Sequence, residues 1–387
     1  MIGMTGRSRI WWWAARALLV GAGVAIALAA AEGAFRWVLH AAPLLDLNIY
    51  YLDAGGLLRM RPGQGRRHVT RHWEVTIAIN GEGFRDLAAP VRSPVPPVLG
   101  LGDSFAFGWG VNLSDTYYSL LERRLGGPRP VRVVKAGIPG TGPGDQFRLL
   151  GAIWDQYRPQ LVIVSLFVGN DFTDVQMGGL AQFQVEDGLL VRRDLRPISW
   201  RERWPRKVVR SSHLLQWLRA VQLSWGRAGN RAGVHAGLAA GDPWLREFVK
   251  VHLREYPVET ARGVAQTLEY LDRFEDFCRQ RGAEFVLAAI PRSYQVYPKE
   301  LWEVQAAFQI PDAELDVDRP QRVLGDWARR RGAAFLDLLP GFRRHRDGHP
   351  GQKLYYYPDA HLNVAGHRLT GDLLAAFLEA RGWPARR

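Results

Sequence analysis

Cysteine is almost absent from this chain of 387 residues, in which Cys278 is the only one. A single cysteine cannot form an internal disulfide framework or a cysteine cluster for a metal ion. The ten histidines also form no spaced set of metal ligands. We therefore expect a protein without a metal or cofactor. The sequence shows no internal repeat either.

Acidic residues are few relative to basic ones: 38 aspartates and glutamates stand against 51 lysines and arginines, which gives a net charge of +13. Such a charge attracts nucleic acid, anionic lipid or anionic polysaccharide. The sequence has no zinc-finger spacing, no RNA-binding signature and no heptads beside a basic region. We therefore expect no nucleic-acid partner, and the other two anionic partners stay open.

The first forty residues contain a long uncharged stretch. Residues 17–31 carry no charge, and with residues 10–15 the apolar segment reaches about 20 residues, enough to cross a bilayer core of about 30 Å. Arginines precede the stretch and three tryptophans lie at its start, which is typical of a single-pass anchor with its amino terminus inside. Residues 1–40 thus predict a signal-anchor in the cell inner membrane, with the body in the periplasm. The alternative is a signal peptide cleaved after the alanines at 29–31.

Residues 41–95 are predicted to form a lead-in segment before the main domain. Within it, residues 73–79 alternate weakly between apolar and polar and predict a strand, and residues 80–83 predict a turn. Prolines at 94, 96 and 97 then mark the start of a domain predicted at residues 96–385.

The domain at 96–385 alternates apolar strand runs with amphipathic helical stretches. The predicted strands cover residues 98–102, 131–136, 161–167, 284–290 and 333–338. The predicted helices cover residues 117–125, 146–156, 260–281, 320–331 and 363–381. Short apolar strands between amphipathic helices predict an α/β fold, in which a central parallel sheet of five strands has helices on both faces.

An insertion at about 172–245 interrupts this alternation. It carries a dense group of basic residues with interleaved tryptophans. Two interpretations stay open: a cap that touches a membrane surface or an acidic polymer, and a solvated helical insertion whose tryptophans pack on the core.

The most informative stretch is residues 98–108, where an apolar run ends in Ser104 and a helix-like stretch begins. This arrangement presents a nucleophile at the carboxyl end of a strand and the start of a helix. A serine hydroxyl is a weak nucleophile until a base takes its proton. Near the end of the chain, His361 offers that base and Asp359 a carboxylate to fix the imidazole tautomer. We predict Ser104, Asp359 and His361 as catalytic residues.

Acyl transfer also needs donors aimed at the developing oxyanion, and loss of one donor typically costs about 100- to 1,000-fold in rate. The predicted donors are the backbone N–H groups of Ser104 and Gly137 and the side-chain amide of Asn170. All three residues follow or end predicted strands, which is where active sites of parallel sheets lie.

Together these motifs resemble the SGNH (GDSL-type) hydrolase superfamily. The four residues that name the superfamily correspond, in order, to Ser104, Gly137, Asn170 and His361, and residues 169–171 match its third block. The resemblance covers about residues 96–381. It implies a flavodoxin-like three-layer α/β/α fold and esterase, lipase or O-acetyl transfer chemistry.

The sequence departs from the superfamily pattern at two points. Lys135 stands where members often have an asparagine, two residues before the glycine of the second block. Only Ala360 separates Asp359 from His361, where two residues are common. The closer spacing is similar to membrane-associated proteins that acetylate alginate and similar exopolysaccharides. Residues 80–86 also look like the lead-in of anchored members found with polysaccharide-export systems.

The resemblance therefore implies a membrane-anchored, exopolysaccharide-associated serine esterase. Such an enzyme removes acyl groups, above all acetyl, from a carbohydrate through an acyl-serine intermediate. Two alternatives stay open: an O-acetyltransferase that modifies an exopolysaccharide with the same serine, and a non-catalytic polysaccharide-binding protein. The expected partners are an acylated carbohydrate or other ester, the membrane through residues 1–40, and, as a candidate, polysaccharide-export machinery.

Overall fold

The computed structural model describes residues 6–38, 43–44, 47–70, 72–87, 96–126, 131–175, 183–186, 188–192, 200–229, 243–357 and 359–383. A parallel sheet of five strands lies at its centre, in the order β7–β6–β8–β11–β12. The strands are β6 (Val98–Gly102), β7 (Val133–Gly137), β8 (Leu161–Phe167), β11 (Glu284–Ile290) and β12 (Ala334–Asp337). In chain order this is 2-1-3-4-5, the flavodoxin-like order. The predicted fold class is confirmed.

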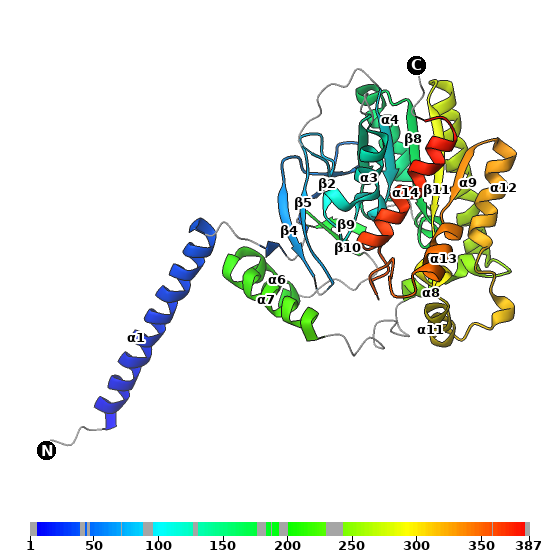
Figure 1. The fold of residues 1–387 in the computed structure, drawn as a ribbon. Coiled ribbons are helices and arrows are strands. Elements are labelled where there is room, and N and C mark those ends of the chain that lie inside the picture. Colours follow the sequence, from blue (N-terminus) through cyan, green and yellow to red (C-terminus); the bar gives the residue numbers. More distant parts are fainter. Residues whose placement is uncertain are drawn as a thin grey trace.

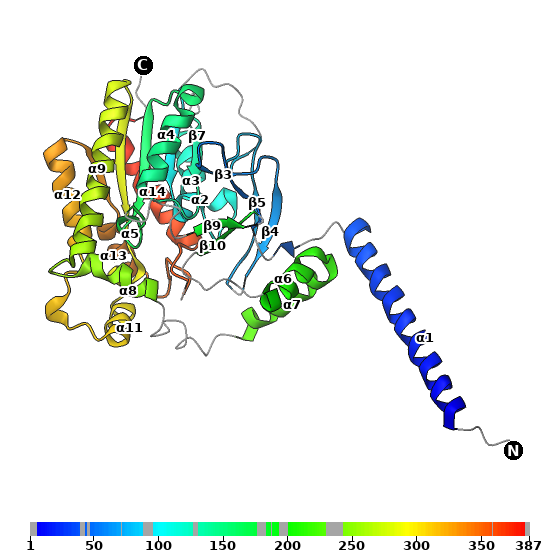
Figure 2. The ribbon, with the colours of Figure 1, turned by 180° about the vertical axis from the view of Figure 1, so that it is seen from behind.

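Helices cover both faces of the sheet (Figures 1 and 2). One face packs against α4 (Pro143–Tyr157), α9 (Val258–Gln280) and α12 (Arg319–Arg331). The other packs against α3 (Tyr117–Leu125), α13 (Leu339–Gly348) and α14 (Val364–Ala380). Side chains of a strand alternate between the faces. In β8, for example, Val162 and Val164 join the first layer, whereas Leu161 and Ile163 join the second.

The lead-in segment forms two small sheets beside the main one. They contain β1 (Pro43–Leu44), β2 (Tyr50–Leu52), β3 (Leu58–Met60), β4 (Gly65–Val69) and β5 (Glu74–Ala78), of which β5 matches the predicted strand. Their buried side chains belong to the same hydrophobic core as the β6 and α4 side chains. The lead-in segment is therefore part of the folded body and not a linker.

Arg85 joins the lead-in segment to the loop that follows the predicted nucleophile. Its side chain is 1% exposed and donates hydrogen bonds to the carbonyl oxygens of Phe107, Gly108 and Val111 at 3.1, 2.6 and 2.6 Å. It also donates to the carbonyl of Thr76 in β5 at 3.1 Å. A buried guanidinium needs such acceptors because its charge is otherwise costly to remove from water.

Lys135, the first departure from the superfamily pattern, forms a second buried link. Its ammonium is 2.8 Å from a carboxylate oxygen of Asp86 in the lead-in segment and 2.6 Å from one of Glu122 in α3. The lysine side chain is 5% exposed. The residue that replaces the usual asparagine therefore fastens the lead-in segment to the core.

The insertion contains the hairpin of β9 (Phe183–Glu186) and β10 (Leu189–Arg192), followed by α6 (Trp200–Ser211), α7 (His213–Gly229) and α8 (Pro243–Val249). Parts of the predicted insertion, at 176–182, 187, 193–199 and 230–242, lie outside the described residues. The remaining short helices are α2 (Ser104–Phe107), α5 (Asp171–Asp174), α10 (Ser293–Val296) and α11 (Pro298–Phe308).

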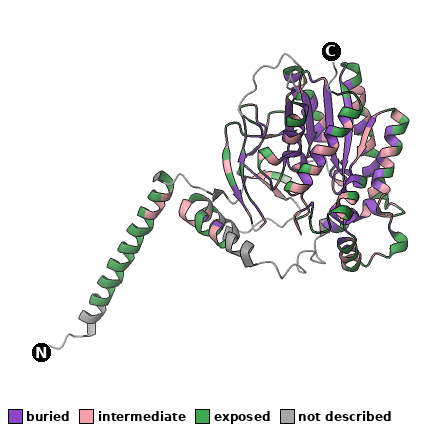
Figure 3. Cartoon of the chain, in the orientation of Figure 1, coloured by how far each residue is buried: buried purple, intermediate pink, exposed green. Residues whose placement is uncertain are grey.

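The amino-terminal helix α1 (Gly6–Gly33) runs into a short π-helix at Ala34–Val38 and extends away from the body (Figure 1). Residues 11–30 are exposed along its whole surface (Figure 3). The stretch Trp11–Trp37 is long and apolar enough to cross a membrane by length and composition, a test that a signal sequence also passes.

Candidate active site

Ser104 lies directly after β6, at the first residue of α2. The preceding Asp103 caps this helix, because its carboxylate accepts the N–H of Phe105 at 2.9 Å. Gly108 ends the helix in the left-handed conformation, with φ of 81°. The short capped helix thus presents the Ser104 hydroxyl at the carboxyl edge of the sheet.

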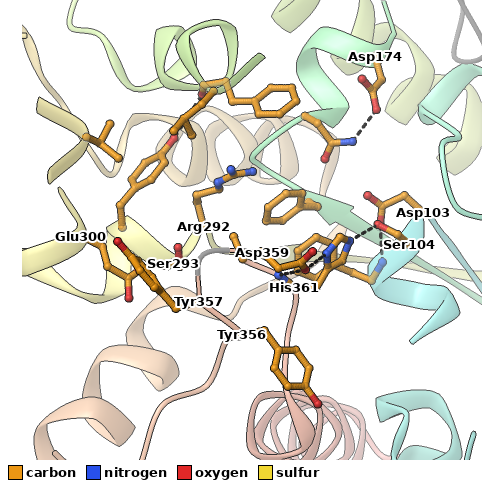
Figure 4. Close-up of a pocket in the computed structure, with 18 of the residues that line it drawn as sticks. Asp103, Ser104, Asp174, Arg292, Ser293, Glu300, Tyr356, Tyr357, Asp359 and His361 are labelled. Atoms are coloured by element: carbon orange, nitrogen blue, oxygen red, sulfur yellow. Dashed lines mark hydrogen bonds and ion pairs between the residues drawn. The ribbon is translucent and has the colours of Figure 1, made fainter. Parts of the chain in front are cut away.

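The predicted nucleophile, base and carboxylate lie together, although 257 residues separate Ser104 from His361 (Figure 4). The Ser104 hydroxyl is 2.8 Å from Nε2 of His361. The other ring nitrogen, Nδ1, is 2.5 Å from Oδ1 of Asp359. A carboxylate on Nδ1 fixes the tautomer that leaves Nε2 free to accept the serine proton.

A tight turn explains how Asp359 reaches His361 across one intervening residue. Ala360 has φ of 68°, in the left-handed region that costs an L-residue about 1–2 kcal/mol. Its N–H donates to the carbonyl of Tyr356 at 2.7 Å, and the Tyr356 N–H donates to the carbonyl of His361 at 2.8 Å. The positive φ turns the Asp359 carboxylate back onto the imidazole. The second departure from the superfamily pattern is therefore compatible with a triad.

Aromatic rings hold the imidazole in place. The Phe105 ring stacks on His361 with 5.0 Å between ring centres, and Trp109 lies at 6.2 Å. The loop that carries the histidine is tied to the loop after α2, because the Tyr356 hydroxyl donates to the carbonyl of Gly110 at 3.0 Å. These contacts fix the base relative to the nucleophile.

Burial and hydrogen bonding shift the pKa values of the acids and histidines around the site in different directions. Burial alone would raise the pKa of Asp359, but the charge and hydrogen bonds of His361 outweigh it and lower that pKa, so Asp359 is ionised at neutral pH. Burial raises the pKa of Asp103 to about 6. Burial lowers the pKa of His367 to about 3, so this ring is neutral at physiological pH. It accepts the N–H of Tyr117 at 3.3 Å, which is a structural role.

Of the three predicted oxyanion donors, the structure brings Ser104 and Asn170 to the cavity but not Gly137. Gly137 ends β7 and packs against α2, where a Cβ would lie 2.4 Å from the backbone nitrogen of Phe107. Gly140, three residues later, lines the cavities that contain Ser104 and His361. Its φ of 77° is a conformation that favours glycine. Gly140, and not Gly137, is thus the glycine of this loop that lines both cavities.

Asn170 begins α5 and lines the same cavity as Ser104. Its side-chain nitrogen donates to the Asp174 carboxylate at 2.5 Å (Figure 4). Asp174 is 2% exposed, and burial raises its pKa well above the usual range. In this orientation the NH2 end of the Asn170 amide faces Asp174.

Two cavities meet at Ser104 and His361. The first, of about 380 Å³, is lined by polar and aromatic side chains that include Arg292, Ser293, Glu300, Tyr356 and Tyr357 (Figure 4). The second, of about 360 Å³, has a mainly apolar lining: Leu47, Tyr50, Trp109, Pro139, Leu189 and Leu190. The lead-in segment and the hairpin β9–β10 thus contribute to the surroundings of the nucleophile. Within the described ranges, no three His, Cys, Asp or Glu side chains gather as a metal ion would require.

Gly140 was not among the predicted site residues, although it lines both cavities. The signal for Gly140 was present in the run of glycines at 137, 140 and 142. Which of these glycines reaches the cavity depends on where β7 ends, and strand ends are poorly defined by apolar patterning.

A sequence model of the GDSL-like lipase/acylhydrolase family matches residues 101–369. The chain belongs to this family and is an ester-bond hydrolase. No curated protein sequence matches the chain.

Several solved structures resemble the fold. TesA is 16% identical with a TM-score of 0.38, and the match covers 73% of this chain and 98% of TesA. Axe2, an acetylxylan esterase from Geobacillus stearothermophilus, is 13% identical with a TM-score of 0.38, over 75% of this chain and 96% of Axe2. LAE5, an α/β hydrolase from the metagenome of Lake Arreo, is also 13% identical with a TM-score of 0.38, over 74% of this chain and 96% of LAE5.

Proposed function

We propose that this chain is a membrane-anchored serine esterase that removes acyl groups from a carbohydrate through an acyl-serine intermediate. The observation that carries the proposal is the hydrogen-bonded series from Ser104 through His361 to Asp359, with distances of 2.8 and 2.5 Å. The series has the geometry in which a histidine activates a serine and a carboxylate stabilises the resulting imidazolium.

The reaction takes two displacements at the same carbonyl. The Ser104 oxygen attacks the ester carbon while its proton passes to Nε2 of His361. The ester C–O bond then breaks, the sugar oxygen takes that proton, and the acyl group stays on Ser104. Water attacks the acyl-serine, gives a proton to His361, and the free acid leaves as the proton returns to the serine oxygen.

We assign the oxyanion site to the backbone N–H groups of Ser104 and Gly140 and the side-chain amide of Asn170. Ser104 and Gly140 both line the two cavities, and Asn170 lines the first. The Asn170 nitrogen has two hydrogens; Asp174 accepts one of them, and we assign the other to the oxyanion. Donors preorganised in this way stabilise the charge of the tetrahedral intermediate.

The lining of the first cavity supports a carbohydrate as the substrate. Its tyrosines offer flat apolar faces, and Arg292, Ser293 and Glu300 offer polar groups for hydroxyl recognition. The apolar second cavity suits the acyl group, because the two cavities meet at Ser104. On this assignment the sugar and the acyl chain extend to opposite sides of the scissile bond.

An inner-membrane location with the catalytic domain in the periplasm is supported by the uncharged, exposed residues 17–30 of α1 and by the arginines that precede this stretch. The strong positive charge of the chain suits an anionic polysaccharide as the substrate. Polysaccharide-export machinery is a candidate partner on the same grounds.

The test is turnover of p-nitrophenyl acetate and longer acyl esters by the full chain in detergent, beside Ser104→Ala and His361→Gln. We expect nitrophenol release to fall by at least about 1,000-fold in both variants, with folding unchanged by circular dichroism. An acetylated oligosaccharide substrate should yield free acetate by mass spectrometry, and an unacetylated oligosaccharide is supplied as a candidate acceptor beside the p-nitrophenyl ester. Acetylated sugar made from the p-nitrophenyl donor would instead identify an O-acetyltransferase, and turnover that survives Ser104→Ala would refute the proposed nucleophile.

A further inference from the structure

The carboxyl end of α1 binds the amino end of α7, although about 180 residues separate them. The Glu32 carboxylate accepts the Ser212 hydroxyl at 2.8 Å and the backbone N–H groups of His213 and Leu214 at 2.9 and 3.1 Å. The first N–H groups of a helix have no partner within the helix and favour a negative charge. Glu32 therefore caps α7 from another part of the chain.

Two neighbours of Glu32 strengthen this junction. Arg36 donates to the Glu32 carboxylate at 3.3 Å and to the carbonyl of Ser211, the last residue of α6, at 3.1 Å. The Phe35 ring packs on Trp217 of α7 with 5.1 Å between ring centres. The helical hairpin α6–α7 is thus fastened to the end of α1, and Figures 1 and 2 both show it beside that end.

The length of α1 sets the depth of the junction if α1 crosses a bilayer, as the proposed function holds. Residues 10–31, in which Arg16 is the one charged residue, span about 33 Å at 1.5 Å per residue, close to the thickness of a hydrocarbon core. Glu32 follows at once and would lie among the headgroups. Trp217 and Leu218 come four and five residues after His213, about 6–8 Å along α7. Both side chains therefore lie within about 8 Å of the junction and within reach of the same headgroup region.

The exposed side chains of the hairpin suit this depth. Trp204 of α6 is 67% exposed, and Trp217 and Leu218 of α7 are 37% and 47% exposed. The sequence of α6 contains four arginines and one lysine against one glutamate. Tryptophan is favoured at the membrane–water interface, and clustered basic residues beside a membrane span attract anionic lipid.

We infer that the hairpin α6–α7 lies on the surface of the bilayer that α1 crosses and binds its anionic lipid headgroups. The inference rests on the proposed function for the position of α1. Charge complementarity and the direct attachment to the membrane-spanning helix both favour a lipid surface. The hairpin then gives the enzyme a second contact with the membrane, so that the body is held at a defined height and orientation.

The experiment uses the full chain in vesicles with a fluorophore at one engineered cysteine. Leu218→Cys places the dye on α7, and Val258→Cys, at a site 66% exposed on α9, is the matched control. The native Cys278 is fully buried, so it will not compete for the label. Quenching by spin-labelled lipid is measured in phosphatidylcholine vesicles with and without phosphatidylglycerol. We expect quenching at 218 to exceed that at 258 and to rise about threefold or more with the anionic lipid.

Variants of the junction and of the basic helix sharpen the test. Glu32→Ala removes the cap and should reduce quenching at 218, whereas Glu32→Gln keeps an acceptor oxygen and should reduce it less. Lys207→Glu, at an exposed position on α6, should weaken the dependence on phosphatidylglycerol. Hydrolysis of p-nitrophenyl acetate should be unchanged in all three.

The outcomes separate this inference from the proposed function. Retention of the chain in carbonate-washed membranes with equal, low quenching at 218 and 258 would overturn the inference and leave the anchor intact. Release of the chain by carbonate would overturn the anchor itself. A larger response of the 218 dye to soluble alginate than to anionic vesicles would assign the hairpin to an acidic polymer and would also overturn the inference.

Discussion

Replacement of Ala360 by proline tests whether the positive φ between Asp359 and His361 makes the triad possible. Proline fixes φ near −65°, whereas Ala360 has φ of 68°. Proline also removes the N–H that donates to the carbonyl of Tyr356 at 2.7 Å. The turn cannot form, so the Asp359 carboxylate should leave Nδ1 of His361.

The magnitude follows from what that carboxylate does. Loss of the acid from a serine triad, with the rest intact, lowers kcat by about 10,000-fold in a buried case. The Asp359 side chain here is 27% exposed, and water partly replaces the lost charge. We therefore expect kcat/KM to fall by about 100- to 10,000-fold in Ala360→Pro. The lost hydrogen bond should lower the free energy of unfolding by only about 1 kcal/mol.

Ala360→Gly is the matched control. Glycine relieves about 1–2 kcal/mol of left-handed strain and loses about 0.5–1 kcal/mol of chain entropy, so stability should change by about 1 kcal/mol or less. Activity should stay within about threefold, because the turn is kept.

The assay is a double-mutant cycle on p-nitrophenyl acetate with Asp359→Ala. If Ala360 acts by delivering Asp359, the proline should cost little in the Asp359→Ala background, because residues that act as a unit are not additive. Independent, multiplying losses would refute the reasoning. So would an Ala360→Pro enzyme that keeps its activity while Asp359→Ala loses it.

Three further predictions concern charges near the site. Burial raises the pKa of Asp103 to about 6 from an ordinary 3.8, so this carboxyl favours the folded state below about pH 4 and loses that contribution as the pH rises through 6. The free energy of unfolding of Asp103→Asn, relative to the unmodified chain, should therefore rise by about 2 kcal/mol between pH 4 and 7 in urea titrations, and a flat difference would contradict the burial argument. Lys135→Met leaves Asp86 and Glu122 without their shared cation and should destabilise the fold by about 3–5 kcal/mol, measured by chemical denaturation; a loss below about 1 kcal/mol would show that the pair is solvated. Asp174→Ala frees the Asn170 amide to rotate and should lower kcat by about 10- to 100-fold with KM nearly constant, and a change confined to KM would argue against an oxyanion role for Asn170.

The sheet was predictable because its strands are buried on both faces. A continuous apolar run such as Leu161–Phe167 between amphipathic helices has few other interpretations. The segments that carry Ser104 and Asn170 were predictable for a related reason, since each lies just beyond a strand end where side chains converge. The segment with Asp359 and His361 follows α13 and was predicted from its residue motif.

The lead-in segment was mostly missed because its strands have two to five residues and a mixed polarity, as in Gly65–Val69. The alternation of apolar and polar residues that marks a strand can be recognised only in longer strands. Gly137 was predicted at the cavity, whereas Gly140 lines it, and this difference has another cause. The cavity residue depends on the backbone path of the loop after β7, and the φ of 77° at Gly140 is set by packing and not by local sequence. The role of Lys135 could not be predicted from the sequence because its partner Asp86 lies far away along the chain.

The separation of Ser104 and His361 along the chain affects when the enzyme becomes active during its synthesis. The nucleophile is made early, but its base lies just before α14, the last helix, which packs on α3. A growing chain therefore holds an unactivated serine. Catalytic power arises only once the segment that carries His361 has joined the rest of the fold.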